Sequence, residues 1–118
     1  MQKLTIWHNP RCSKSREALL LLDANGVQTE VIKYLEKQPS SDEIKKILKM
    51  LNFSTARKLM RTKEEIYKEL NLKNETDEEK LIEAMVQHPK LIERPIIIKD
   101  DKAIIARPPS LVEEFLKL

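Results

Sequence analysis

The chain has 118 residues, of which 41% are hydrophobic and 35% charged, and this composition predicts a soluble globular protein. It contains one glycine, which excludes a dinucleotide-binding fingerprint and a Walker phosphate loop, and one cysteine, which excludes an intrachain disulfide, a Cys-x-x-Cys redox pair and a cysteine-rich zinc site. The formal charge is +3, but basic and acidic residues are interleaved along most of the chain and aromatic residues make up only 4%, so we expect no nucleic-acid partner.

The first residues predict neither a signal peptide nor a membrane segment. Met1-Gln2-Lys3 leads directly into a short strand-like run, and the longest apolar stretch, residues 18–22, is far too short to cross a bilayer. We therefore expect no membrane association and a cytoplasmic location, where a free thiol stays reduced.

Residues 3–32 carry the pattern of a strand, a helix and a second strand. Residues 3–7 alternate as in a strand, and from Ser13 onward apolar residues recur with helical spacing until Asn25-Gly26 provides a left-handed end. Residues 29–32 form a second run rich in β-branched side chains. Together they predict a βαβ unit with a parallel pair of strands and a right-handed crossover.

Residues from about 40 to 88 are predicted to be almost entirely helical. Apolar residues recur with helical spacing over residues 44–51 and 81–86, a shorter helical stretch is expected over residues 54–61, and the last helix is expected to end near His88-Pro89. Three capping-box patterns announce these helices: Ser40 with Glu43, Thr62 with Glu65, and Thr76 with Glu79.

The last third of the chain predicts a hairpin and a helix. Residues 95–98 and 103–106 are apolar runs that flank the polar turn Asp100-Asp101-Lys102, and Pro108-Pro109-Ser110 opens a final amphipathic helix. The element order predicts an α/β fold, a thioredoxin/glutaredoxin-like mixed four-stranded sheet with a helical insertion between strands two and three. We expect residues 1–118 to form a single domain of this kind, with the insertion at about residues 40–88.

Cys12 lies at the junction of the first strand and the first helix, where ligands of open α/β sheets bind. Apart from Pro10, its neighbours in residues 8–16 are polar or charged. Unpaired N–H groups and the positive end of the helix dipole point at a sulfur in this position, and such settings lower a thiol pKa from ~8.5 to ~3.5–7.5. The same N–H groups, with the hydroxyls of Ser13 and Ser15, are expected to hold an oxyanion.

A thiolate that attacks an oxyanion meets like charge, so the site needs cations, and planar arginines are expected. Arg94 and Arg107 each precede a proline at the end of a hydrophobic strand, and a cis Pro95 would pack the Arg94 loop against the start of the first helix. Arg57 and Arg61 lie one turn apart, and their spacing does not tell which of them faces the site. His8 is a proton donor, a cation near the sulfur or a structural residue.

Four segments in this order and at these separations resemble the glutaredoxin-linked arsenate reductases of the ArsC family. They are residues 8–16 (His-Asn-Pro-Arg-Cys-Ser-Lys-Ser-Arg), Tyr34-Leu35 before Pro39, residues 91–96 (Leu-Ile-Glu-Arg-Pro-Ile) and Arg107-Pro108. The likeness covers nearly the whole chain, although the chain stops soon after its last predicted helix, without the C-terminal extension of some members.

The resemblance implies a thioredoxin-like fold and the reduction of arsenate to arsenite by a single catalytic cysteine, Cys12. It further implies that an arginine triad, Arg61, Arg94 and Arg107, binds the substrate, with His8 and Ser15 in supporting roles. Arg57 stays an alternative to Arg61, because this chain carries an extra residue in that helical stretch.

Because the chain has no second cysteine, the electrons for any reduction must come from outside it. We expect the Cys12 thiolate to attack arsenic, glutathione to attack the adduct as a cosubstrate, and a glutaredoxin to resolve the mixed disulfide. The resemblance implies the same two partners. No metal and no tightly bound cofactor is expected, and the protein is expected to act as a monomer.

Three other functions fit parts of the pattern. The fold family includes Spx-like regulators that bind RNA polymerase, but these usually carry a second cysteine where this chain has Ser15. An ArsC-like thiol reductase that acts on another oxyanion or on a disulfide stays open, because the sequence indicates an anion site and not which anion. A cysteine phosphatase would need an arginine at position 18, which is Ala18.

Overall fold

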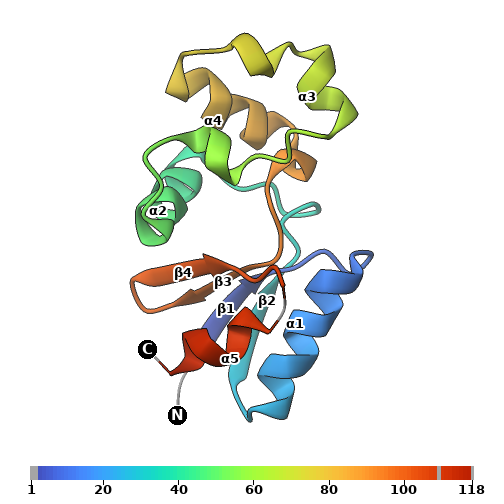
Figure 1. The fold of residues 1–118 in the computed structure, drawn as a ribbon, viewed down its shortest axis with the longest axis vertical. Helices are drawn as coiled ribbons and strands as arrows, with labels where there is room; N and C mark the ends of the chain where they lie inside the picture. Colours follow the sequence, from blue (N-terminus) through green and yellow to red (C-terminus); the bar gives the residue numbers. More distant parts are fainter. Residues whose placement is uncertain (1–2, 109, 118) are drawn as a thin grey trace. The chain divides into compact units, whose positions relative to one another are not determined.

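The computed structural model describes residues 3–108 and 110–117 and divides the chain into two compact units. The first unit combines the residues before 38 with those after 93, and the second unit is residues 38–93. Whether residues 1–118 act as a single domain stays a prediction. The first unit contains the strands β1 (Lys3–Trp7), β2 (Gln28–Ile32), β3 (Ile96–Lys99) and β4 (Lys102–Ile105), and the helices α1 (Ser13–Ala24) and α5 (Leu111–Leu116) (Figure 1).

The strands of the first unit form one mixed sheet in the order β2-β1-β3-β4. β1 and β2 are parallel, whereas β3 is antiparallel to both β1 and β4, so the predicted α/β sheet is confirmed. α1 and α5 cover the same face of this sheet (Figure 1). The buried core between them consists of Leu4, Ile6, Ala18, Leu22, Ile97, Ala106, Val112 and Phe115.

The register of the strands brings several chain segments to one edge of the sheet. Trp7 at the end of β1 pairs with Ile32 at the end of β2 and with Ile96 at the start of β3, and Ile96 also pairs with Ile105 at the end of β4. The loops that leave β1, β2 and β4 therefore meet the loop that enters β3. The residues next to these strand ends include His8, Lys33, Arg94 and Arg107.

The first helix begins and ends where the sequence predicts. Cys12 is the N-cap residue of α1, with the extended backbone angles φ −95° and ψ 123°. At the other end, Gly26 has φ +69°, a conformation that is strained for residues with a side chain. The predicted left-handed end of the helix is thus confirmed at Gly26.

The second unit is helical, as predicted for this part of the chain. It contains the α-helices α2 (Ser41–Leu51), α3 (Glu65–Glu69) and α4 (Glu78–Gln87), and the short 3-10 helices η1 (Ala56–Leu59), η2 (Leu72–Asn74) and η3 (Pro89–Leu91). α4 packs against α2, η1 and η3 because its apolar residues lie on one side of the helix, as the spacing predicts. Its buried residues are Leu81, Ile82, Ala84 and Met85.

Of the three predicted capping boxes, only that of Ser40 is confirmed: its hydroxyl accepts the Glu43 N–H at 3.2 Å. The Thr62 box is wrong, because the chain first makes a turn in which the Glu64 N–H donates to the Arg61 carbonyl at 3.2 Å, and α3 starts only after Glu64. The Thr76 box is wrong by one residue. Asp77 caps α4 instead, and its carboxylate accepts the N–H of Glu79 at 3.0 Å.

The helix expected over residues 54–61 is also wrong beyond residue 59. Only Ala56–Leu59 form a helical turn, and Met60 forms an antiparallel bridge with Ile92. The Glu93 N–H donates to the Leu59 carbonyl at 2.7 Å, and the Arg61 N–H donates to the Leu91 carbonyl at 2.6 Å. These long-range hydrogen bonds hold the chain extended where local periodicity predicted a helix, so Arg57 and Arg61 do not share a helix face.

The C-terminal hairpin and helix agree with the prediction to within one or two residues. β3 starts at Ile96 rather than Pro95, because proline has no N–H to give to the sheet. β4 starts at Lys102, and α5 follows at Leu111; Pro109, part of the predicted helix start, lies outside the described residues. Within the part of the chain that the structure describes, no helix is long and apolar enough to span a bilayer.

Candidate active site

Cys12 lies at the end of a tight loop that follows β1. The Cys12 N–H donates to the Asn9 carbonyl at 3.0 Å, and the Arg11 N–H donates to Asn9 Oδ1 at 3.0 Å. The thiol is half-buried, while Arg11 and the following residues Ser13 and Lys14 are exposed. The loop therefore holds the sulfur at the N-terminus of α1 and leaves it accessible.

Ser15 fixes this loop from inside the helix. Its side chain is fully buried, and its Oγ accepts the Asn9 N–H at 3.1 Å and lies 2.7 Å from His8 Nδ1. The sequence suggested that the Ser15 hydroxyl would help to hold an oxyanion. That role is wrong, because this hydroxyl is enclosed and already bonded within the loop.

His8 is buried in the same cluster, and its environment favours the uncharged imidazole. Burial lowers the pKa of His8, and the positive charges of Lys33 and Arg16 lower it further. At neutral pH the ring is therefore neutral. Of the three roles considered from the sequence, this lowered pKa disfavours both the cation beside the sulfur and the proton donor, because both need the protonated ring.

The pKa of the Cys12 thiol is shifted in the direction that the sequence predicts. Burial raises the pKa of the thiol, but the backbone N–H groups of Ser15 and Lys14 and the guanidinium of Arg94 lower it by more, so that the pKa lies below its ordinary value. Hydrogen bonds and a positive charge both favour the thiolate over the thiol. The structure thus places a thiol with a lowered pKa at the start of α1.

Arg94 is the cation that the structure brings to the sulfur. The peptide bond between Arg94 and Pro95 is cis. Burial lowers the pKa of Arg94, but its contacts with Cys12 and with Tyr34 raise it above the ordinary value. Its Nε is buried and has no hydrogen-bond partner among the residues that the structure describes. A donor beside the thiolate is therefore available to a ligand.

Tyr34 and Lys33 are site residues that the sequence reasoning missed as such. Tyr34 is fully buried, stacks on Trp7 with ring centroids 6.0 Å apart and contacts Arg94. Lys33 acts on His8 through its charge. A signal was present in the sequence: both residues follow the second strand of a parallel pair, whose end shares an edge with the end of the first strand.

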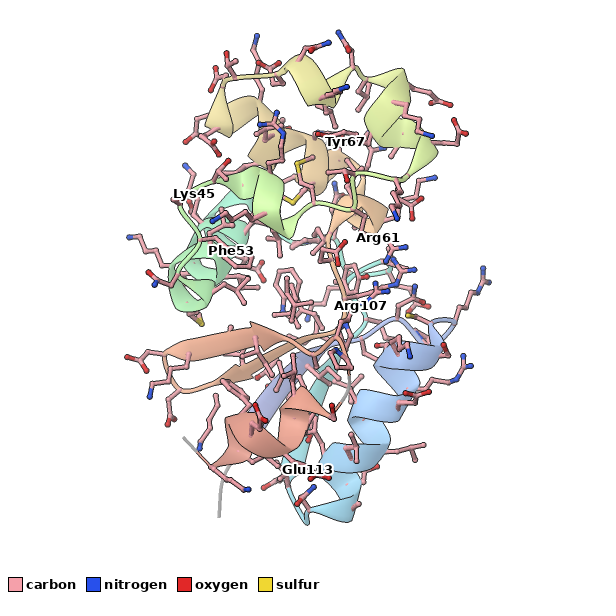
Figure 2. The ribbon with its side chains drawn as sticks, viewed as in Figure 1. Lys45, Phe53, Arg61, Tyr67, Arg107 and Glu113 are labelled. Carbon is pink, nitrogen blue, oxygen red and sulfur yellow. The ribbon has the colours of Figure 1, made fainter. Side chains whose placement is uncertain are left out.

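Arg107 lies at the same edge of the sheet, two residues after β4. Its side chain is exposed, its N–H donates to the Ile105 carbonyl at 2.9 Å, and its peptide bond with Pro108 is cis. Figure 2 shows the side chain at the end of the strand. The structure therefore groups Cys12, His8, Ser15 and Arg94 in direct contacts, with Arg107 on the same edge.

The two remaining arginine candidates, Arg61 and Arg57, belong to the second unit, and Figure 2 labels Arg61 there. Arg61 is half-buried, and its Nε lies 3.0 Å from Glu64 Oε1. Arg57 donates from Nη2 to the carbonyls of Leu72, at 2.8 Å, and Glu75, and from Nε to the hydroxyl of Tyr67 at 3.2 Å. These bonds hold the chain around η2, so the structure assigns Arg57 a structural role.

Among residues 3–108 and 110–117, no group of three or more His, Cys, Asp and Glu side chains is placed to hold a metal ion.

The mixed four-stranded sheet is that of a thioredoxin-like protein. This protein has a single cysteine, at the start of its first helix, in place of a Cys-x-x-Cys pair. The chain matches the ArsC family over residues 7–115. An uncharacterized protein of Escherichia coli K12 is 52% identical over 98% of both chains. An arsenate reductase of Haemophilus influenzae is 50% identical over 94% of this chain and 97% of that protein.

A solved structure of an arsenate reductase from Vibrio cholerae has the same fold. It superposes with a TM-score of 0.93 at 48% identity and covers 96% of this chain and 97% of that one. The chain belongs to the ArsC family, as the four sequence segments indicated.

Proposed function

We propose that this protein is an oxidoreductase that reduces arsenate to arsenite, with Cys12 as its nucleophile. The observation that carries the proposal is the contact between the Cys12 thiolate and Arg94, whose buried Nε has no partner among the described residues. A nucleophile beside a free planar donor is the arrangement that an attack on an oxyanion requires. Membership of the ArsC family and the relatives named arsenate reductase support the same activity.

The substrate is proposed to bind at the start of α1. One arsenate oxygen would accept a hydrogen bond from Arg94 Nε, and the first N–H groups of the helix would face the remaining negative charge. Following the family resemblance, we propose Arg107 and Arg61 as further cations for the substrate.

The first chemical step joins sulfur to arsenic. The thiolate of Cys12 attacks arsenic(V), an S–As bond forms, and one As–O bond breaks as its oxygen takes up protons and leaves as water. The arginine charges offset the repulsion between the thiolate and the oxyanion. Arsenic is still in its +5 state after this step.

The second step is the reduction. A glutathione thiolate attacks the Cys12 sulfur, an S–S bond forms, the S–As bond breaks, and its electron pair stays on arsenic, which becomes arsenic(III) and leaves as arsenite. A glutaredoxin thiol then attacks the glutathione sulfur of this mixed disulfide and releases the Cys12 thiolate. Because Cys12 is the only cysteine in the chain, the proposal requires both external thiols, and it places the protein in the reducing cytoplasm.

The test is a coupled assay with glutathione, glutaredoxin, glutathione reductase and NADPH. We expect NADPH oxidation that depends on arsenate, on glutaredoxin and on Cys12, with Cys12→Ser reduced to the background rate. Cys12→Ser must show the circular dichroism spectrum of the folded parent to serve as a control. Arsenate-independent oxidation, or equal rates for the parent and Cys12→Ser, would exclude the proposal.

The same assay distinguishes arsenate reduction from the alternative function, the reduction of a disulfide. If a small disulfide substrate in place of arsenate supports Cys12-dependent turnover and arsenate does not, the protein is a thiol reductase of another substrate class. The nucleophile and its arginine would then be shared, and only the substrate would differ.

A further inference from the structure

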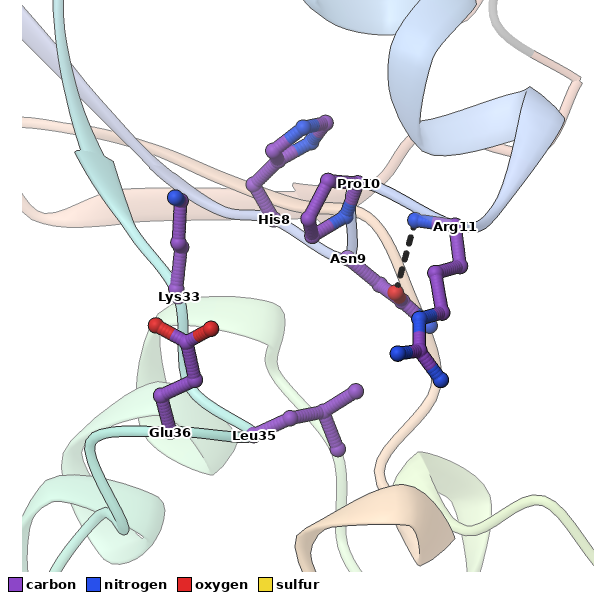
Figure 3. Close-up of a pocket in the computed structure, with 7 residues that line it drawn as sticks. All are labelled: His8, Asn9, Pro10, Arg11, Lys33, Leu35 and Glu36. Atoms are coloured by element: carbon purple, nitrogen blue, oxygen red, sulfur yellow. Dashed lines mark hydrogen bonds between the residues drawn. The ribbon is translucent and has the colours of Figure 1, made fainter.

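A cavity of about 200 Å³ lies beside the Cys12 loop, within the first unit (Figure 3). It is lined by residues 8–11 on one side and by Lys33, Leu35 and Glu36 on the other. The first group leads directly to Cys12, and the second follows β2 at the same edge of the sheet. The cavity is therefore built by the loops that hold the nucleophile.

The cavity carries mixed charge that is not neutralised within the protein. Arg11 and Lys33 are positive and Glu36 is negative, all three side chains are exposed, and none forms an ion pair with any residue that the structure describes. Figure 3 shows Arg11 on one side, Lys33 and Glu36 on the other, and Leu35 between them. Leu35 is 40% exposed, an apolar surface that a ligand can cover.

We propose that this cavity binds the reducing cosubstrate, glutathione, before its thiol attacks Cys12. Glutathione carries two carboxylates and one ammonium at neutral pH. Arg11 and Lys33 match its two carboxylates, Glu36 matches its ammonium, and Leu35 contacts its methylene groups. The inference rests on the proposed function, which already requires an external thiol, and adds the place where that thiol binds.

The sign of the charges favours this ligand over the oxyanion substrate. An inorganic oxyanion in the cavity would gain from Arg11 and Lys33 but would be repelled by Glu36, whereas a zwitterionic peptide uses all three charges. A separate cavity for the thiol also leaves Arg94 and the start of α1 to the oxyanion. The two reactants would then approach Cys12 from different groups of residues, which avoids competition for the same cations.

The test uses a reaction that does not involve arsenate. Cys12 is first converted to its mixed disulfide with 2-thiopyridine, and an added thiol then releases the coloured thione in a single turnover. Glutathione is compared with 2-mercaptoethanol, which has no charged groups. We expect the rate to saturate with glutathione and to rise linearly with 2-mercaptoethanol, because only glutathione binds before it reacts.

Arg11→Ala and Lys33→Ala remove one cation each. Each is expected to lower the second-order rate constant with glutathione about twofold to fivefold, the range for a single exposed ion pair. The double variant is expected to lower it on the order of tenfold. The rate of Arg11→Ala with 2-mercaptoethanol should not change, and for Lys33→Ala, whose charge also acts on His8, the glutathione rate should fall by more than the 2-mercaptoethanol rate. Lys37→Ala is the matched control, because this exposed lysine of the same segment does not line the cavity.

Glu36 is tested with a second ligand. Glu36→Gln should slow the reaction of glutathione but not that of N-acetylglutathione, which lacks the ammonium group. Higher salt should remove the advantage of glutathione over 2-mercaptoethanol in the parent protein.

Three results would overturn the inference. The first is a release rate that rises linearly with glutathione in the parent, and the second is an unchanged glutathione rate in the Arg11 and Lys33 variants. The third is an equal loss of rate with both thiols, which would mean that the substitutions change the reactivity of the Cys12 sulfur. Circular dichroism of each variant excludes loss of the fold. Because no step uses arsenate, failure of the arsenate assay and failure of this assay are separate outcomes.

Discussion

Each unit of the chain holds a half-buried arginine, and the two arginines differ in how their hydrogen-bond donors are used. Arg57, in the second unit, donates to two backbone carbonyls and to the Tyr67 hydroxyl. Arg94, in the first unit, contacts the sulfur of Cys12 and keeps a buried Nε without a partner among the described residues. A buried donor without a partner is unfavourable for stability, so it marks a place where a ligand is expected.

This comparison predicts that the two arginines fail in opposite assays when they are removed. Arg94→Ala is expected to lower kcat/KM for arsenate on the order of 100-fold, the loss typical of one donor to a developing oxyanion. The free energy of unfolding should change by less than about 1 kcal/mol. Steady-state kinetics measure kcat/KM, and urea denaturation of the same preparation measures the free energy of unfolding. Arg94→Lys keeps the charge but not the planar guanidinium, so it tests whether a positive charge alone supports the activity. If Arg94→Ala keeps the kcat/KM of the parent for arsenate, Arg94 does not bind the substrate.

Arg57→Ala is expected to show the reverse. It removes the Arg57 donor of the Glu75 carbonyl and one of the two donors of the Leu72 carbonyl, which keeps the N–H of Glu75, and we expect a loss of about 2 kcal/mol in the free energy of unfolding. The rate at which Cys12 reacts with an alkylating agent should stay that of the parent. Lys58→Ala, an exposed neighbour in η1, is the matched control and should be neutral. If Arg57→Ala keeps the stability of the parent but Cys12 is alkylated more slowly, Arg57 acts at the site instead.

The pH dependence of the thiol sharpens the role of Arg94. Because the pKa of Cys12 lies below its ordinary value, alkylation should stay fast below that value and slow only as the pH falls through the lowered pKa. Arg94→Ala should move the midpoint upward, since a neighbouring positive charge and a hydrogen-bond donor are lost. Iodoacetamide kinetics between about pH 5 and 10 measure the midpoint. An ordinary midpoint in the parent would contradict the assignment of Cys12 as a thiolate.

The same shift is linked to stability. A group whose pKa is lowered by folding stabilises the folded state above its unfolded pKa, and this contribution is lost as the pH falls through the folded pKa. The stability of the parent relative to Cys12→Ser should therefore rise with pH across this window.

The sequence predicted the parts of the site that depend on local pattern, and it missed those that depend on long-range pairing. Cys12 at a helix start, the sheet and the end of α1 follow from alternation, turn residues and periodicity. The contact of Tyr34 with Arg94 depends on strand register. Arg57 and Arg61 were placed on one helix because local spacing carries no information about the bridge between Met60 and Ile92.

Ser40 and Thr62 are each followed by a glutamate three residues later, but only Ser40 caps a helix. The contribution of this cap to stability is the smallest effect predicted. Ser40→Ala removes a hydroxyl that accepts the Glu43 N–H at 3.2 Å, and we expect a loss of about 1 kcal/mol in the free energy of unfolding. Thr62→Ala should be neutral, because α3 begins after Glu64 and Thr62 caps nothing there. Neither change should alter the alkylation rate of Cys12. Urea denaturation of the two variants decides between the local pattern, which predicts equal losses, and the structure, in which only Ser40 caps a helix.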